Sequence, residues 1–161
     1  MIAEAKARAL LAAARARSLR IATAESCTGG LVGAAITDIA GSSDVFDRGF
    51  VTYSYPAKVA MLGVPQILLT EHGAVSEAVA RAMAEGALAA SEADVAVAVT
   101  GVAGPGASEA KPEGLVWFAT ATAERTHAER REFGPLGRER VRQRSVETAL
   151  ELALQALARL P

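Results

Sequence analysis

The sequence is poor in the residues that most often signal disulfide frameworks, zinc sites and membrane spans. Its 161 residues include one cysteine, Cys27, and two histidines, His72 and His127. A single cysteine excludes an internal disulfide, and no Cys/His spacing resembles a zinc site. No apolar run is long enough to span a bilayer, and the stretch after Met1 lacks the apolar core of a secretory leader. We therefore expect a cytoplasmic protein, where thiols stay reduced.

An excess of charge of either sign is also lacking. The formal net charge is -1, which argues against general binding to nucleic acids or membrane surfaces. Hydrophobic residues make up 51% and charged residues 22% of the chain, so we expect one globular domain over residues 1–161. Lysine is scarce as well: of 17 basic residues, only Lys6, Lys58 and Lys111 are lysines. A lysine inside a motif is therefore a candidate for chemistry, because a desolvated lysine can accept a proton and an arginine cannot.

Hydrophobic periodicity predicts an alternation of helices and strands. Helices are expected at 2–17, 27–39, 56–63, 65–71, 77–91 and 141–160. Strands are expected at 19–23, 45–53, 94–100, 114–123 and 126–133. This order predicts an α/β fold with three layers, α/β/α, around a mixed, mostly parallel sheet of about five strands. The last two strands form a hairpin-like pair, and the charges of the final one predict an edge position.

Two segments rich in glycine and hydroxyl side chains follow predicted strands. Residues 23–30 read TAESCTGG and residues 100–106 read TGVAGPG. In α/β folds such strand ends line the ligand crevice, and glycines there let backbone N–H groups approach an anion. The second segment, with Lys111 at its rim, is either a phosphate or ribose loop or a flexible surface turn. Its glycine spacing is not the dinucleotide-binding fingerprint.

Ser26 and Cys27 stand where the first of these segments leads into a predicted helix. Ser26 is either a nucleophile whose oxyanion is held by the amides of residues 27–30 or simply the N-cap of that helix, which position alone favours. A thiol at a helix N-terminus is also a competent nucleophile. For Cys27, however, packing in the core is the favoured interpretation.

A serine nucleophile needs a base, and Lys58 is a better candidate than His72 or His127. A lysine base must be neutral, so its pKa must fall well below the usual value through burial or nearby positive charge. The alternative is an ordinary exposed lysine on a short helix, which the residues alone favour. Tyr53 or Tyr55 could relay or orient the proton. Arg138 and Arg142 are either a phosphate clamp or solvated charge.

Taken together, these segments resemble the CinA C-terminal domain family, the nicotinamide-nucleotide amidases. The resemblance covers nearly the whole chain, and the combination of motifs is specific although no single motif is. The matching segments are 23–30, 40–43, 49–54, 57–58, 73–76, 100–106 and 111–112. Three positions depart from the family pattern. The family often has Asn at Tyr55, the segment before the last helix keeps only Arg138, and the Gly/Pro loop is about one residue short near Ala107-Ser108.

The resemblance implies hydrolysis of the carboxamide of nicotinamide mononucleotide to nicotinic acid mononucleotide and ammonia. It implies Ser26 as nucleophile, Lys58 as base and Tyr53 in a supporting role, with no metal or organic cofactor and a homodimer or larger homo-oligomer. The expected substrate-binding residues are Glu25, Cys27, Thr28, Gly29, Gly30, Tyr55, Thr100, Gly101, Gly104, Lys111 and Arg138. The alternative is a non-catalytic nucleotide-binding or competence-related module.

Overall fold

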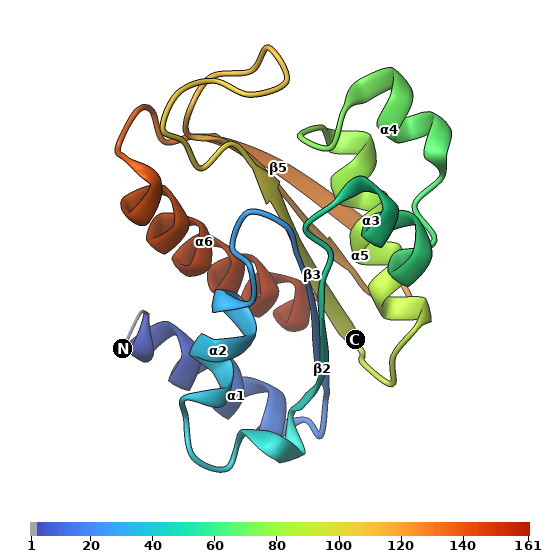
Figure 1. Ribbon diagram of the computed structural model, residues 1–161. Helices are drawn as coiled ribbons and strands as arrows, with labels where there is room; N and C mark the ends of the chain where they lie inside the picture. The colour runs from blue at the N-terminus through green and yellow to red at the C-terminus, as the bar shows by residue number, and fades with distance from the viewer. Residues whose placement is uncertain (1–2) are drawn as a thin grey trace.

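Five strands form one mixed sheet at the centre of the computed structural model, which describes residues 3–161 (Figure 1). The strand order is β2-β1-β3-β4-β5. β1 pairs in parallel with β2 and β3, whereas β4 is antiparallel to both β3 and β5. β4 alone therefore runs against the other strands, and the predicted mixed, mostly parallel sheet is confirmed. The strands are β1 (Ile21–Glu25), β2 (Phe46–Val51), β3 (Val95–Gly101), β4 (Leu115–Ala121) and β5 (Thr126–Glu132).

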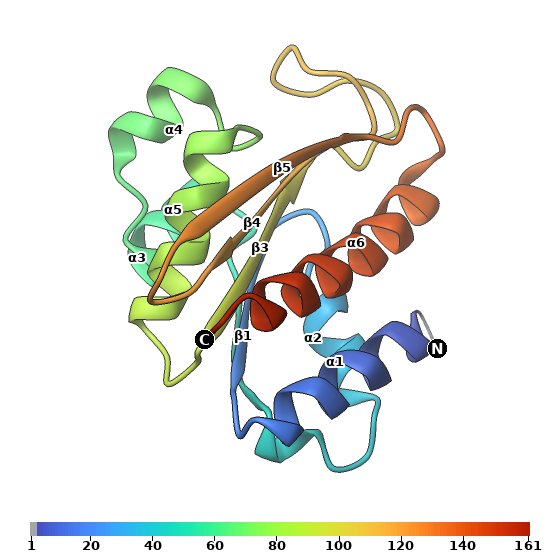
Figure 2. The ribbon, with the colours of Figure 1, turned by 180° about the vertical axis from the view of Figure 1, so that it is seen from behind.

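The alternation of valine and alanine in β3 gives the sheet two unlike faces. Because successive side chains point to opposite faces, Val95, Val97 and Val99 lie on one side and Ala96 and Ala98 on the other, all buried. One helical layer packs on the valine side and a second on the alanine side (Figures 1 and 2). The first comprises α1 (Glu4–Ala16), α2 (Leu31–Thr37) and α6 (Arg138–Ala158). The second comprises α3 (Tyr55–Leu62), α4 (Gln66–His72) and α5 (Glu77–Ala89).

Helices α3 and α5 approach each other closely on the alanine side. A Cβ added to Gly86 of α5 would lie 2.0 Å from the backbone oxygen of Leu62 in α3, so only glycine permits this contact. Ser54 caps α3 by accepting a hydrogen bond from the Ala57 N–H, and Pro56 occupies the first turn as predicted. These contacts place α3, which carries Lys58, beside the carboxyl end of β1.

Several helix ends differ from prediction. The second helix starts at Leu31 instead of residue 27, because the preceding residues form a tight turn in which Gly29 and Gly30 have φ of 59° and 107°. The last helix starts at Arg138, three residues before the expected start at Val141. The first begins at Glu4, and the predicted start at residue 2 lies outside the described residues.

Residues 3–161 show neither a membrane-spanning helix nor a cluster of metal-ligating side chains. No helix there combines the length and apolar character that a membrane crossing requires. Within the same residues, no group of three or more His, Cys, Asp or Glu side chains is placed to hold a metal ion. A short 3-10 helix, Ser42–Asp44, completes the secondary structure.

Candidate active site

A cavity of about 250 Å³ opens at the carboxyl ends of β1 and β3. The turn after β1, the start of α3 and the loop after β3 bound it, which is where ligands bind in open parallel sheets. Of the residues predicted from sequence, the cavity brings together Ser26, Cys27, Tyr53, Tyr55, Lys58, Thr100, Gly101, Gly104 and Arg138. The cavity therefore opens at the two glycine-rich strand ends that the sequence singled out.

Lys58 and Ser26 are in direct contact inside this cavity. Nζ of Lys58 lies 2.9 Å from Oγ of Ser26. It also lies 2.7 Å from the backbone oxygen of Thr52 and 3.4 Å from the backbone oxygen of Tyr53. The lysine is fully buried, with 0% of its surface exposed, and Ser26 is 9% exposed. The expectation of an ordinary exposed lysine is therefore wrong.

Burial lowers the pKa of Lys58 to about 8 from its ordinary value of 10.5. Loss of hydration is the dominant cause, since a buried ammonium loses the water that stabilises its charge. The Glu109 carboxylate opposes this effect by raising the pKa, and it is not hydrogen-bonded to Nζ. A large fraction of Lys58 is consequently neutral near pH 8, and a neutral amine this close to a hydroxyl can accept its proton.

The turn after β1 holds Ser26 in place. The Gly29 N–H donates to the Ser26 backbone oxygen at 3.0 Å. The buried Glu25 carboxylate accepts hydrogen bonds from the N–H groups of Gly30, Val32 and Gly33. Glu25 therefore caps α2, the role that the N-cap interpretation gave to Ser26, and leaves the serine hydroxyl free to meet Lys58.

Backbone donors of cavity-lining residues are available to hold an oxyanion. The N–H groups of Cys27, Ala103 and Gly104 belong to cavity-lining residues and donate to no acceptor among residues 3–161. The amides of Gly29 and Gly30, expected to share this role, are engaged within the turn. Of the four predicted amides, Cys27 is the one that combines a place in the lining with a free donor.

The other candidate nucleophile and bases are less suited to chemistry. Cys27 packs in the core, and burial raises the pKa of its thiol to about 12, which disfavours the thiolate. His72 pairs with Glu71, and His127 pairs with Glu129 on β5. Neither histidine lines the cavity.

The last two residues of β3 and the loop after it form one wall of the cavity, from residue 100 to residue 109. The Thr100 hydroxyl donates to the Ala74 backbone oxygen at 2.9 Å and so binds the base of the loop to the segment before α5. The Glu113 carboxylate accepts from the N–H groups of Gly106 and Gly137 and links the loop to the start of α6. Gly104 has a φ of 91° and lies against Glu113, which leaves no room for a side chain.

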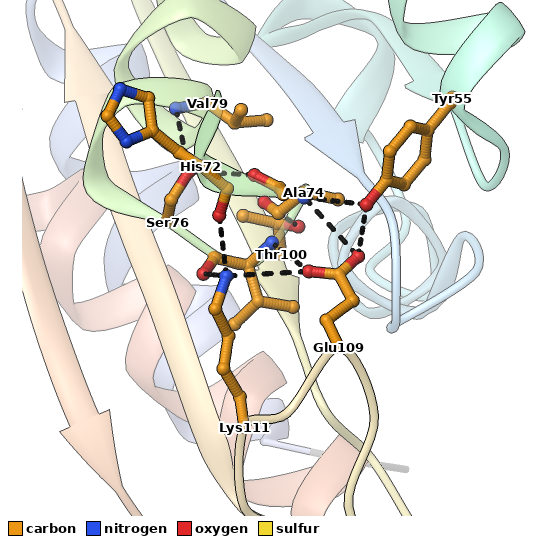
Figure 3. Close-up of polar contacts among 10 residues, drawn as sticks. Tyr55, His72, Ala74, Ser76, Val79, Thr100, Glu109 and Lys111 are labelled. Carbon is orange, nitrogen blue, oxygen red and sulfur yellow. Dashed lines mark hydrogen bonds and ion pairs between the residues drawn. The ribbon is translucent and has the colours of Figure 1, made fainter. Parts of the chain in front are cut away.

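At its far end the loop is joined to the segment of residues 72–75 (Figure 3). The Glu109 carboxylate accepts from the Tyr55 hydroxyl and from the N–H groups of Ala74 and Val75. Lys111 donates to the backbone oxygens of His72 and Val75 and approaches Glu109. Lys111 thus lies outside the cavity lining, with its donors directed at protein oxygens.

Two arginines of α6 contact the site from the opposite side. Arg138 lines the cavity and donates to the Gly104 backbone oxygen at 2.7 Å and to the Tyr53 hydroxyl at 2.8 Å. Arg142 donates to the backbone oxygens of Cys27 and Thr28. Arg138 is therefore placed at the rim, whereas Arg142 supports the turn that carries Ser26.

Four more predicted residues lie behind the cavity lining, in or next to the turn after β1. Glu25 and Thr28 are fully buried, and the Thr28 hydroxyl has no hydrogen-bond partner among the described residues. Gly29 lies against the Arg142 guanidinium, and Gly30 lies against Val51. The structure gives these residues a place in shaping the turn.

Sequence reasoning missed Glu109, which is the acidic side chain among the cavity-lining residues that the structure describes. It also missed Ala74 and Val75, which form part of the wall. The available signal was an acidic residue between a Gly/Pro loop and Lys111, but the N–H groups that its carboxylate accepts from are 34 and 35 positions away in the chain.

Comparison with known proteins gives consistent results. The CinA C-terminal domain profile matches residues 3–157. The chain is 54% identical over 144 residues to the nicotinamide-nucleotide amidohydrolase PncC of Escherichia coli K12, covering 89% of this chain and 87% of that protein. It is 52% identical over 137 residues to the protein of the same name from Pseudomonas putida, covering 84% and 85%.

A solved structure shares the fold along nearly the whole chain. The competence/damage inducible protein CihA from Agrobacterium tumefaciens superposes with a TM-score of 0.94 at 48% identity, covering 99% of this chain and 97% of that one. The profile match and the identity to full-length relatives agree with the observed architecture. The chain therefore belongs to the CinA C-terminal domain family.

Proposed function

We propose that this protein hydrolyses the carboxamide of nicotinamide mononucleotide to nicotinic acid mononucleotide and ammonia, a step in pyridine nucleotide recycling. The observation that carries the proposal is the contact between a fully buried Lys58 and the Ser26 hydroxyl, 2.9 Å apart in the cavity. The names of the two bacterial amidohydrolases that resemble this chain support the choice of substrate.

The first half of the reaction acylates the serine. Oγ of Ser26 attacks the carboxamide carbon while neutral Lys58 takes the hydroxyl proton. The tetrahedral oxyanion is stabilised by the free N–H groups at the cavity wall, with Cys27 as the nearest candidate in sequence. When the C–N bond breaks, the Lys58 ammonium returns its proton to the leaving nitrogen, which departs as ammonia.

The second half restores the enzyme. Water attacks the ester on Ser26, and neutral Lys58 takes a proton from it. Collapse of the second tetrahedral intermediate breaks the bond to Oγ, which recovers its proton from Lys58 and releases the carboxylic acid. No step needs a metal ion, because the lysine and the backbone donors supply the proton transfers and the charge stabilisation.

We propose that the rest of the nucleotide reaches the rim of the cavity, where Arg138 and Tyr53 are joined by a hydrogen bond. A guanidinium at an open rim suits a phosphate monoester. The Lys111 ammonium is less suited to this role, since backbone oxygens and Glu109 already occupy its donors.

The test is release of ammonia from nicotinamide mononucleotide in the presence of a metal chelator. Ser26→Ala and Lys58→Met are each expected to lower kcat by on the order of a thousandfold or more, as when one member of a catalytic unit is removed. Lys6→Met, at a partly exposed lysine paired with Glu151, is the matched control and should leave kcat unchanged. Full activity in either site variant would refute the mechanism.

The same experiment separates the enzyme from a non-catalytic nucleotide-binding module. Saturable binding of the nucleotide with no ammonia formed over hours would favour the module.

We also propose that the protein is a homodimer or larger oligomer, because Val51, Tyr53, Met61 and Ile67 expose between 44% and 59% of their surface. Light scattering of the purified chain measures this, and a monomeric mass would contradict it.

A further inference from the structure

Four separate segments of the chain meet beside the cavity at a group of residues that we call the junction (Figure 3). The junction consists of Tyr55, Ala74, Val75, Thr100, Glu109 and Lys111, which come from α3, the segment before α5, β3 and the loop after β3. Ala74 is at its centre: its oxygen accepts from Thr100, and its N–H lies within hydrogen-bond reach of both the Tyr55 hydroxyl and Glu109.

Glu109 has no acceptor site left for a substrate. One oxygen accepts from the Val75 N–H and faces Lys111, and the other accepts from the Tyr55 hydroxyl and the Ala74 N–H. A carboxylate offers about four acceptor positions, and the protein fills them all. Although Glu109 lines the cavity, its contacts suit it to hold parts of the protein together and not to bind the ligand.

Tyr55, which contacts Glu109, lies on the same helix as Lys58, the proposed base. Tyr55 and Lys58 are three residues apart on α3 and therefore lie on the same face of the helix. On this face Tyr55 is bound to the loop wall, and Lys58 is bound to Ser26. A change in the position of Tyr55 would thus move the amine relative to the hydroxyl.

We propose that Glu109 is a positioning residue for the reaction: through Tyr55 and residues 74–75 it fixes the loop wall and α3, and it places a negative charge in the lining of the cavity that holds the base. The inference rests on the proposed function. Glu109 makes no contact with the reacting atoms in this proposal. It affects the reaction by changing the position and the charge of Lys58.

The charge has a consequence that a purely structural contact would not have. Glu109 raises the pKa of Lys58, opposing the larger effect of burial. The other titratable or charged side chains of the cavity lining are the neutral Cys27 thiol, the hydroxyls of Tyr53 and Tyr55, and Arg138 at the rim. The Glu25 carboxylate is directed instead at the amides of α2. Removing the charge of Glu109 therefore favours neutral Lys58 at lower pH.

Three variants separate the contact from the charge. Glu109→Gln keeps the shape and removes the charge, and Tyr55→Phe keeps the charge and removes the hydroxyl. Glu132→Gln is the control, because Glu132 is exposed on β5 and its carboxylate has no hydrogen bond or ion pair among the described residues. Thermal unfolding of each variant shows whether it is folded at the assay temperature.

Two rates are measured across pH 6–10. One is kcat/KM for nicotinamide mononucleotide; the other is the labelling rate of Ser26 by a fluorophosphonate, followed by intact mass. In that labelling, Oγ bonds to phosphorus, fluoride leaves, and Lys58 takes the proton. Labelling tests the inference without the nucleotide, so a wild-type protein that is labelled but releases no ammonia contradicts only the proposed substrate.

We expect Glu109→Gln to lower both rates at high pH by on the order of tenfold to a hundredfold, as sub-ångström misplacement of catalytic groups does. The acid limb of the pH–rate profile of Glu109→Gln should also move to lower pH. Tyr55→Phe should lower the rates and leave the limb in place, and Glu132→Gln should change neither.

Wild-type rates and an unmoved limb in Glu109→Gln would overturn the proposal, as would an equal shift in Glu132→Gln. If Glu109→Gln does not fold, an unchanged rate in folded Tyr55→Phe overturns it instead. A wild-type protein in which Ser26 is not labelled would overturn both this inference and the mechanism.

Discussion

Replacement of Lys58 by methionine tests the energetic consequence of burying the base. Methionine is an unbranched side chain that fills irregular space in cores, so Lys58→Met removes the amine and keeps much of the packing. It also leaves the Thr52 backbone oxygen without the hydrogen bond that Nζ donates. That loss is independent of pH, whereas the energy of charging a buried amine is not.

The magnitude follows from the pKa of Lys58, about 8 in the folded chain against an ordinary 10.5. Between these pH values the unfolded lysine binds a proton that the folded one does not, so wild-type stability rises with pH across this window. At about 1.4 kcal/mol for each pH unit, the folded protein is destabilised by ~3 kcal/mol at pH 7. The destabilisation falls to ~1.4 kcal/mol at about pH 9.5, a difference of ~2 kcal/mol.

The assay is urea unfolding of wild type, Lys58→Met and the control Lys6→Met at pH 7 and pH 9.5. Wild type should gain about 2 kcal/mol relative to Lys58→Met as the pH rises, and the gap between wild type and Lys6→Met should show no comparable change. Comparing the difference in the free energy of unfolding between wild type and Lys58→Met at two pH values cancels the pH-independent contribution of the lost hydrogen bond to Thr52. A gap that stays constant within about 0.5 kcal/mol would show that Lys58 is not destabilised in its charged form, and the reasoning would fail.

Three further outcomes follow from the same geometry. The acid limb of kcat/KM should have its midpoint near pH 8, since only neutral Lys58 can accept the Ser26 proton; a rate that is flat from pH 6 to 9 would contradict this. Cys27→Ser should keep most of the ammonia release, because burial holds the thiol in its neutral form; complete inactivation would move the nucleophile to Cys27. Gly86→Ala should destabilise the fold by about 3 kcal/mol because its methyl group would collide with the Leu62 oxygen, and an unfolding curve like that of wild type would refute the close contact between α3 and α5.

The sequence predicted those features that depend on local pattern. The apolar run at 94–100 identified the strand that the structure shows as β3, and the glycines after two strands identified the edge of the sheet where the cavity opens. The scarcity of lysine pointed to Lys58, and the structure places it against Ser26 although 32 positions separate the two residues.

The features that local pattern could not predict arise from contacts between distant segments. Glu25 reads as part of a ligand loop, but its carboxylate turns back to cap α2. Lys111 reads as a phosphate ligand, but it meets backbone oxygens of residues 72 and 75. Glu109 gives no periodic signal, because its partners lie on two other segments of the chain.

The proposed mechanism requires an uncharged Lys58 beside Ser26, and NMR titration of lysine labelled with ¹³C at Cε measures the charge of this side chain. With only three lysines in the chain, the resonance lost in Lys58→Met identifies the one of interest. We predict that this resonance titrates with a midpoint near pH 8. A Lys58 resonance that remains in its charged form up to pH 10 would contradict the proposed role of this lysine as the base.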